Sequence, residues 1–342
     1  MKKALAISLS LVFPLCLLQA AALDESLHTD GERVLSAFGD VGNIAKQSKI
    51  TIMDGTKIRC QGTLVSDDGL IVTKYSELEG AREPYKLVNK EIGRRFYRAR
   101  LVAYDTKSDL AVLRSNIRHK TGLKFGSSDG LEIGRWVVAG VDQSPGLHAG
   151  IVSAFIRNIP KEGGVIGVQL DDGNKSIGGV PVRVVVAGSP AQKAGLKRGD
   201  IIFAINNKEI FTTQALIKAV TQYNPGEKVK VSLKRRGEKM DFVITLGYRV
   251  TVFDNPRMRN RNDSLSVQVS KRRSGFERVI QHDTTMTTAD IGGPLLDLEG
   301  KLIGINIARA NRVEFFAIPI EHVKQVLKEN EKLIKESRNK RI

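Results

Sequence analysis

The 342-residue sequence has few of the residues that bind metals or form disulfides. It contains 2 cysteines and 5 histidines, and none of them cluster with the spacing of a metal site. We therefore expect neither a bound metal nor a cofactor. Cys16 lies in an N-terminal apolar stretch, so a chain that has lost this stretch keeps only Cys60 and cannot form an internal disulfide.

Long apolar runs are missing beyond the first residues. The opening stretch "MKKALAISLSLVFPLCLLQAAALDES" has two lysines, a short apolar run and then small residues, which is the order of a secretory signal peptide. A membrane anchor is the alternative, but the run is short and contains Pro14. We expect residues 1–22 to be a signal peptide cleaved after Ala22, and the chain to be exported to the periplasm or the extracellular space.

Acidic residues are scarce relative to basic ones: 37 Asp and Glu stand against 54 Lys and Arg, a formal net charge of +17. This charge suits an anionic partner or an anionic envelope surface, whereas nucleic acid is not expected because no reader motif is present. Three basic runs are either solvated surface or contacts to such a partner. They are "NPRMRNRND", "SKRRSG" and "KESRNKRI".

From about residue 50 to 160 the sequence shows short alternating apolar runs separated by Gly, Asp and Ser, for example "GTLVSDDGLIVTKY" and "IGRWVVAGV". This spacing is typical of antiparallel strands in a barrel or sandwich. The next segment differs, because it predicts a helix from about Thr212 and a hairpin turning at Gly237. The strand pattern returns from "FERVIQHD" to "FFAIP", and a helix is expected from about Glu321.

The middle segment contains "GSPAQKAGLKRGDIIFAINNKEI", then the expected helix and a closing hairpin. These features, over roughly residues 163 to 248, resemble a PDZ domain of the kind attached to bacterial HtrA/Deg proteases. The resemblance implies that this segment binds the C-termini of peptides or proteins by strand addition, with the N–H groups of a glycine-containing loop holding the carboxylate.

The flanking pieces resemble the trypsin-like protease domain of the same family. "VSDDGLIVTKYSEL" matches the strand that ends in Thr-Asn-(Asn/Ala)-His-Val-Val in the family, and "YDTKSDLAVLR" matches the strand that carries the aspartate. "IQHDTTMTTADIGGPLLDLEGKLIGINIARA" matches Ile-Gln-Thr-Asp-Ala-Ala-Ile-Asn-Pro-Gly-Asn-Ser-Gly-Gly-Pro without a gap. With the PDZ segment, the resemblance extends from about residue 40 to 328.

The resemblance implies a mainly β protein with a two-barrel trypsin-like (chymotrypsin-type) fold and an inserted α+β PDZ domain. In the usual arrangement PDZ domains follow a complete protease domain, but here the PDZ segment interrupts the second barrel. Insertion at a loop tip is tolerated when the inserted domain's termini lie close together. The expected divisions, in chain order, are a signal peptide (1–22), a first trypsin-like part (40–160), the PDZ domain (163–248), a second trypsin-like part (249–328) and a charged C-terminal tail (329–342).

Serine-protease chemistry needs a hydroxyl nucleophile, a histidine base and an aspartate that orients the histidine. By the match to the family, the serine position holds Ile291 and the histidine position holds Ser76, so neither group can do its task. Asp109 matches the aspartate, although without a histidine it reads more simply as a polar residue at the entry to a strand.

The oxyanion position is altered as well. The family's glycine two places before the serine is Ala289 here, and a glycine can take backbone angles that a β-carbon makes costly. No substitute catalyst is evident: His282 is expected to cap or pack, and the other candidates lack an acid-base partner in sequence. These candidates are Cys60, His119, His148, Thr284, Thr285, Thr287 and Thr288.

In the PDZ segment the resemblance assigns the carboxylate-binding loop to "VIGV", with a helix lining the pocket for the last side chain of the peptide. The alternative is that these apolar residues only close the core of the domain. The candidate peptide-binding residues are Val165, Ile166, Gly167, Val168, Leu216, Ile217 and Val220.

The sequence therefore predicts an exported HtrA-like pseudoprotease, a PDZ-mediated adaptor for peptides or proteins in the envelope, in a family associated with protein quality control. Two alternatives stay open. One is an active serine-type endopeptidase of unusual mechanism, or one completed by a partner chain. The other is a noncatalytic subunit of a homo-oligomer or of a complex with an active protease.

Overall fold

The computed structural model describes residues 24–27, 31–140, 147–249, 252 and 268–339. The expected signal peptide, residues 1–22, lies outside the described residues, and so does the basic run "NPRMRNRND". No helix within the described ranges is long and apolar enough to cross a membrane.

The chain divides into two compact units, with the boundary between Ala37 and Phe38. The described part of the first unit contains two short helices, η1 (Glu25–Leu27) and α1 (Glu32–Ala37). The second unit holds everything from Phe38 onward and begins with helix α2 (Gly39–Ser48).

The first barrel is closed by six antiparallel strands in the order β1-β2-β3-β6-β5-β4. It forms because apolar side chains of these strands fill the interior, where Ile52, Leu87 and Leu113 are fully buried. Its strands are β1 (Lys49–Asp54), β2 (Lys57–Leu64), β3 (Leu70–Lys74), β4 (Tyr85–Asn89), β5 (Gly93–Asp105) and β6 (Leu110–Ser115).

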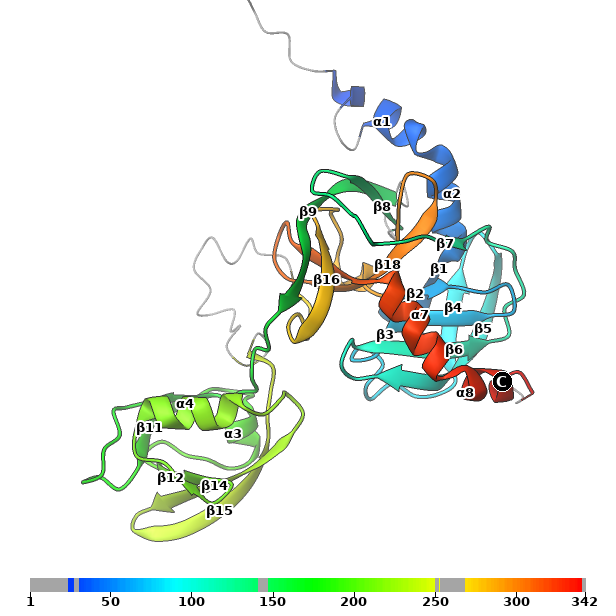
Figure 1. The fold of residues 1–342 in the computed structure, drawn as a ribbon. Coiled ribbons are helices and arrows are strands. Elements are labelled where there is room, and N and C mark those ends of the chain that lie inside the picture. Colours follow the sequence, from blue (N-terminus) through cyan, green and yellow to red (C-terminus); the bar gives the residue numbers. More distant parts are fainter. Residues whose placement is uncertain (1–23, 28–30, 141–146, 250–251, 253–267, 340–342) are drawn as a thin grey trace, which may run out of the picture. The chain divides into compact units, whose positions relative to one another are not determined.

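The second barrel is built from strands on both sides of the 163–248 segment, in the order β17-β8-β9-β16-β19-β18, and it closes because β17 also pairs with β18. In Figure 1 the green β9 and the yellow-orange β16 lie side by side although they are far apart in the sequence. The strands are β8 (Trp136–Gly140), β9 (Leu147–Ile159), β16 (Phe276–His282), β17 (Pro294–Leu296), β18 (Lys301–Arg309) and β19 (Phe315–Pro319), with β7 (Lys124–Phe125) added parallel to β18.

The middle segment has its own sheet, in the order β10-β11-β12-β14-β15, and its own apolar core. Ser189 and Thr212 begin its two helices, because each side chain accepts a hydrogen bond from a backbone N–H of the first turn. The elements are β10 (Val168–Leu170), β11 (Val180–Val185), α3 (Pro190–Lys193), β12 (Ile201–Ile205), β13 (Lys208–Glu209), α4 (Thr213–Thr221), β14 (Lys228–Arg235) and β15 (Glu238–Thr245).

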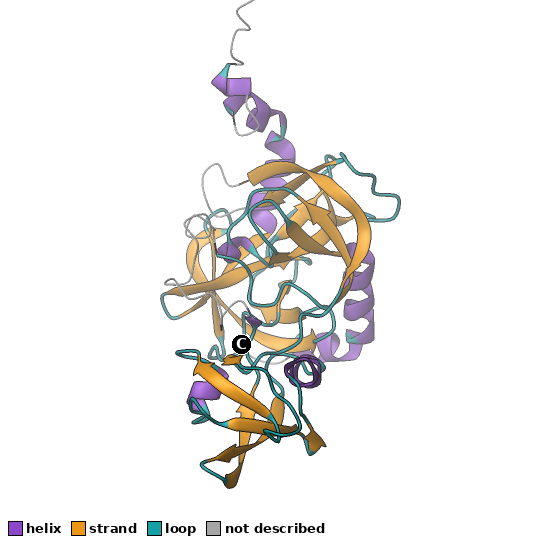
Figure 2. Cartoon of the chain, turned by 90° about the vertical axis from the view of Figure 1, so that its left-hand side faces the viewer, coloured by secondary structure: helices purple, strands orange, loops and turns teal. Residues whose placement is uncertain are grey.

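Two helices end the described chain, α7 (Ile320–Glu329) and α8 (Glu331–Ser337). The second lies within the stretch expected to be a charged tail. It is held to barrel 1 because the buried Arg114 donates to the Ile334 carbonyl and to the Ser337 hydroxyl. Strands dominate the cartoon in Figure 2, and the predicted fold class is confirmed: two six-stranded barrels and a PDZ domain.

Candidate catalytic and peptide-binding sites

Ile291, at the serine position, lies in the apolar interior of barrel 2 and is 1% exposed. It packs in one cluster with residues such as Val137, Met286 and Phe315. Its carbonyl accepts a hydrogen bond from the N–H of Gln61 in barrel 1, at 2.8 Å. The side chain at this position therefore contributes to the core, and its aliphatic carbons offer no nucleophile.

The Gly-Gly-Pro turn after Ile291 is retained for a packing reason. Gly292 has a φ of 98°, and a β-carbon there would come within 1.9 Å of the Gln61 carbonyl oxygen. Its N–H donates to the Asn306 carbonyl at 2.7 Å. Only glycine fits so close to another backbone, so the turn brings the two barrels together whether or not a serine precedes it.

The loop that would supply oxyanion donors forms one turn of 3-10 helix, η2 (Thr288–Asp290). Thr287 and Asp290 make a reciprocal capping box around it. Within this turn the Ala289 N–H donates to the Thr287 hydroxyl and the Asp290 N–H donates to the Thr287 carbonyl, both at 3.2 Å. An oxyanion would have to compete with these internal bonds.

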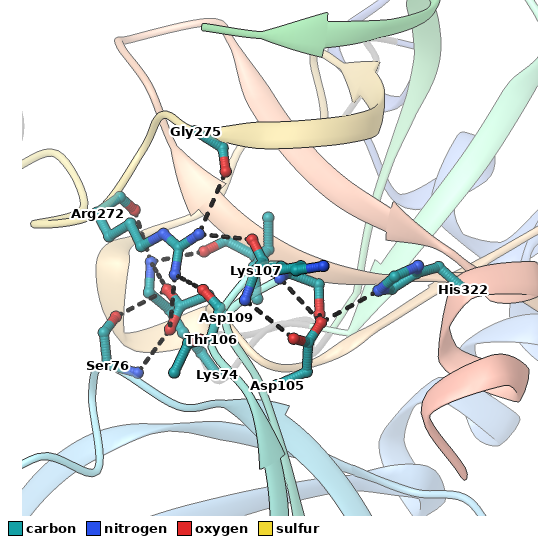
Figure 3. Close-up of polar contacts among 11 residues, drawn as sticks. Lys74, Ser76, Asp105, Thr106, Lys107, Asp109, Arg272, Gly275 and His322 are labelled. Carbon is teal, nitrogen blue, oxygen red and sulfur yellow. Dashed lines mark hydrogen bonds and ion pairs between the residues drawn. The ribbon is translucent and has the colours of Figure 1, made fainter. Parts of the chain in front are cut away.

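Ser76, at the histidine position, is bonded directly to Asp109. Its backbone N–H donates to Asp109 Oδ1 at 2.8 Å and its hydroxyl donates to Asp109 Oδ2 at 2.9 Å (Figure 3). Asp109 is completely buried and has a φ of 63°, in the left-handed region where Asp is tolerated better than most residues. The structure thus brings these two predicted residues together and leaves Ile291 in a separate, apolar environment.

Lys74 is a buried cation in this cluster that sequence reasoning missed. Its Nζ donates to the Arg272 carbonyl at 2.7 Å and to the Ile307 carbonyl at 2.8 Å, and it lies 3.5 Å from Asp109 Oδ2. Burial lowers the pKa of Lys74, and the charge of Asp109 acts in the opposite direction. Because Ile307 is on β18, one side chain of barrel 1 bonds to the backbone of barrel 2.

Arg272 adds a second positive charge from the residues that precede β16. Its Nη1 lies 4.0 Å from Asp109 Oδ1, and its guanidinium donates to the carbonyls of Thr106, Lys107 and Gly275 (Figure 3). The buried carboxylate of Asp109 is therefore balanced by cations and hydroxyl and amide donors, where a serine protease would have its imidazole.

The other candidates for a substitute catalyst lie in structural environments. His282 is buried, its Nε2 lies 2.9 Å from Asn306 Oδ1, and its ring stacks on Phe315. Burial lowers the pKa of His282 to about 4. Burial raises the pKa of the Cys60 thiol to about 12, which disfavours the reactive thiolate. His148 Nδ1 contacts the Thr285 carbonyl oxygen.

The expected carboxylate-binding loop has the backbone shape that its glycine permits. Gly167 has a φ of 82°, and a β-carbon there would lie 2.4 Å from that of Ser189. Val165 forms an isolated bridge to Gly247, and Val168 begins the edge strand β10. Within the described ranges no acceptor takes the N–H groups of Ile166 and Gly167.

The apolar side chains of helix α4 differ in their exposure to solvent. Leu216 and Val220 are buried in the core of the middle segment, while Ile217 is 51% exposed. The hydroxyl of Thr213, in the first turn of the helix, donates to the carbonyl of Asp171 at the end of β10, at 3.1 Å. Leu216 and Val220 thus serve the core, and Ile217, one turn after Thr213, is the exposed side chain of the three.

Two family models match the chain, and their ranges overlap within the PDZ segment, from residue 164 to 183. The family described as trypsin-like peptidase domain matches residues 60–183, and the family described as PDZ domain matches residues 164–246. The first match includes the positions of Ser76 and Asp109 and ends before the loop that holds Ile291.

The curated relatives carry the name probable periplasmic serine endoprotease DegP-like. The one from Hahella chejuensis is 28% identical over 268 residues, covering 54% of this chain and 56% of the relative. The one from Chlamydia trachomatis is 27% identical over 271 residues, covering 55% of this chain and 54% of the relative. The chain thus spans about half the length of these relatives. Among solved structures, a serine endoprotease from Yersinia pestis is 21% identical, with a TM-score of 0.30 over 61% of this chain and 97% of its own.

Proposed function

Because the chain belongs to the HtrA/Deg family of trypsin-like peptidases with a PDZ domain, we propose that it is a pseudoprotease that works as a peptide-binding adaptor. The curated relatives are named periplasmic, which supports a place for this chain in the cell envelope. Its partners would be the C-termini of peptides or proteins.

The observation that carries the proposal is the location of Ile291. A side chain that is 1% exposed in the core of barrel 2 cannot attack a substrate, and removal of a nucleophile alone reduces turnover by about six orders of magnitude. The second support is Ser76, whose hydroxyl is engaged with Asp109 and which cannot accept a proton near neutral pH.

The binding role rests on the loop and edge strand of the PDZ segment. A peptide added as a strand along β10 would place its carboxylate near the N–H groups of Ile166 and Gly167. Its last side chain, if apolar, would contact Ile217 above the buried Leu216 and Val220. One short strand and one side chain give an affinity on the order of micromolar.

Hydrolysis and binding are tested separately on the purified chain. We expect no cleavage of unfolded casein and no labelling by a fluorophosphonate probe, and labelling at any residue of the 284–291 loop would overturn the pseudoprotease assignment. We expect calorimetric titration to show binding of peptides with a free C-terminus and an apolar last residue. The matched control is the same peptide with an amidated C-terminus, and equal binding of both forms would exclude this use of the loop.

A further inference from the structure

Positively charged side chains face one another across the outer surface of barrel 1. In the register of strands β4, β5 and β6, Lys86 lies directly opposite Arg98, and Arg100 lies directly opposite Arg114. Like charges in directly opposed positions of a sheet repel each other by a fraction of a kcal/mol, so anions that bind here would relieve an unfavourable interaction.

The chain itself neutralises one of these four cations. Arg114 is buried, lies 3.1 Å from Asp68, and donates to carbonyl and hydroxyl groups of α8. In contrast, no carboxylate within the described ranges forms an ion pair with Lys86, Arg98 or Arg100. Glu336 lines a small hollow of about 110 Å³ together with Arg100, but the two do not form an ion pair.

An exposed aromatic side chain adjoins these cations. Along β5, Phe96, Arg98 and Arg100 alternate with residues that face inward, so all three lie on the outer surface. Phe96 is 62% exposed, and the Nζ of Lys86 lies 3.4 Å from the centre of its ring. Basic side chains beside an exposed aromatic ring are a combination that suits a surface lying against lipid headgroups.

We propose that Lys86, Arg98 and Arg100, here called the cationic strip, bind the phosphate groups of an anionic lipid surface, and that the exposed ring of Phe96 makes an apolar contact with the same surface. Barrel 1 is closed and has no free strand edge, so an acidic peptide could not add to it as a strand and would be held by side chains alone. Lipid phosphates are separate anions, and each guanidinium can bind one of them through two N–H groups. The strip is distinct from the PDZ loop and does not depend on the adaptor proposal.

The test is co-sedimentation of the purified chain, without residues 1–22, with vesicles of phosphatidylglycerol and phosphatidylcholine. Each basic residue near such a surface strengthens binding about fivefold, so Arg98→Gln/Arg100→Gln should weaken it about thirtyfold. The control Lys175→Gln/Lys208→Gln removes the same charge from exposed lysines of the PDZ segment, and binding should change little. Phe96→Ser should weaken binding by an amount that persists at high salt, because the lost contact is apolar.

Several outcomes would overturn the proposal. One is equal sedimentation of the chain with pure phosphatidylcholine vesicles and with vesicles that contain phosphatidylglycerol. Another is an equal loss of vesicle binding in the two double variants. A third is release of the chain from vesicles by polyglutamate as strongly as by added phosphatidylglycerol. The last result would indicate an acidic protein as the partner. Calorimetric titration with a C-terminal peptide should be unchanged in Arg98→Gln/Arg100→Gln, which separates failure of this proposal from failure of the adaptor proposal.

Discussion

The triad positions of a serine protease hold polar residues in barrel 1 and an apolar residue in barrel 2. In barrel 1, the aspartate position keeps its carboxyl group, which lies among Lys74, Ser76 and Arg272. In barrel 2, the serine position holds Ile291 inside an apolar cluster. The stability of the polar cluster in barrel 1 depends on each buried charged group keeping its partner. The stability of the apolar cluster in barrel 2 depends on close packing without cavities. Substitutions should therefore have different consequences on the two sides.

The largest effect is expected for Lys74→Met. This change leaves the Asp109 carboxylate buried without its nearest cation, and breaking a buried pair costs about 4 kcal/mol in the free energy of unfolding. Urea denaturation followed by intrinsic fluorescence measures the loss. The double variant Lys74→Met/Asp109→Asn should recover part of it, and a double variant less stable than the single one would contradict this account.

A smaller effect, about 3 kcal/mol, is expected for Ile291→Ser. The change removes buried carbons from the barrel 2 core and places a hydroxyl among apolar neighbours. The same urea experiment measures it. Despite the restored serine, casein cleavage should stay at background because Ser76 cannot act as a base, and measurable cleavage would refute the assignment of the histidine position.

Barrel 2 should also be sensitive to acid through His282. The unfolded chain binds a proton at this side chain below about pH 6.5, while the folded chain does so only below about 4. Stability due to the neutral imidazole is thus complete above pH 6.5 and falls as the pH drops toward 4, by about 2 kcal/mol at pH 5. His282→Gln should flatten this part of the stability profile, and an unchanged slope would assign the acid sensitivity to other groups.

The smallest effect is expected for Ile291→Val, which removes one methyl group from the same cluster. The loss should be about 1 kcal/mol, because the site stays apolar and nearly filled. A loss as large as that of Ile291→Ser would show that shape, and not polarity, dominates at this position. Thermal unfolding of the three forms side by side resolves the difference.

Local pattern was enough to predict the strands and the helix that begins after Thr212, whereas the assignment of Ser76, Asp109 and Ile291 to triad positions came from the resemblance to the family. Lys74 was missed because a lysine at the end of a strand normally reaches solvent, and its acceptors on Arg272 and Ile307 are remote in sequence. Helix α8 was missed because its charged residues suggested a tail. The buried Ile334 and its contact with Arg114 depend on tertiary packing.

The interruption of barrel 2 has a consequence for the order in which the chain folds. Strands β8 and β9 are synthesised before the PDZ segment, and their partners β16 to β19 come after it. Chains are synthesised from the N-terminus, so barrel 1 and the PDZ segment can form their sheets before β16, the partner of β9, has been synthesised. Pairings across so many intervening residues form slowly because the loop entropy is lost before the contacts are gained. Barrel 2 should therefore be the last part to fold. Until then the edge of β9 that later pairs with β16 has no partner strand and is prone to aggregation.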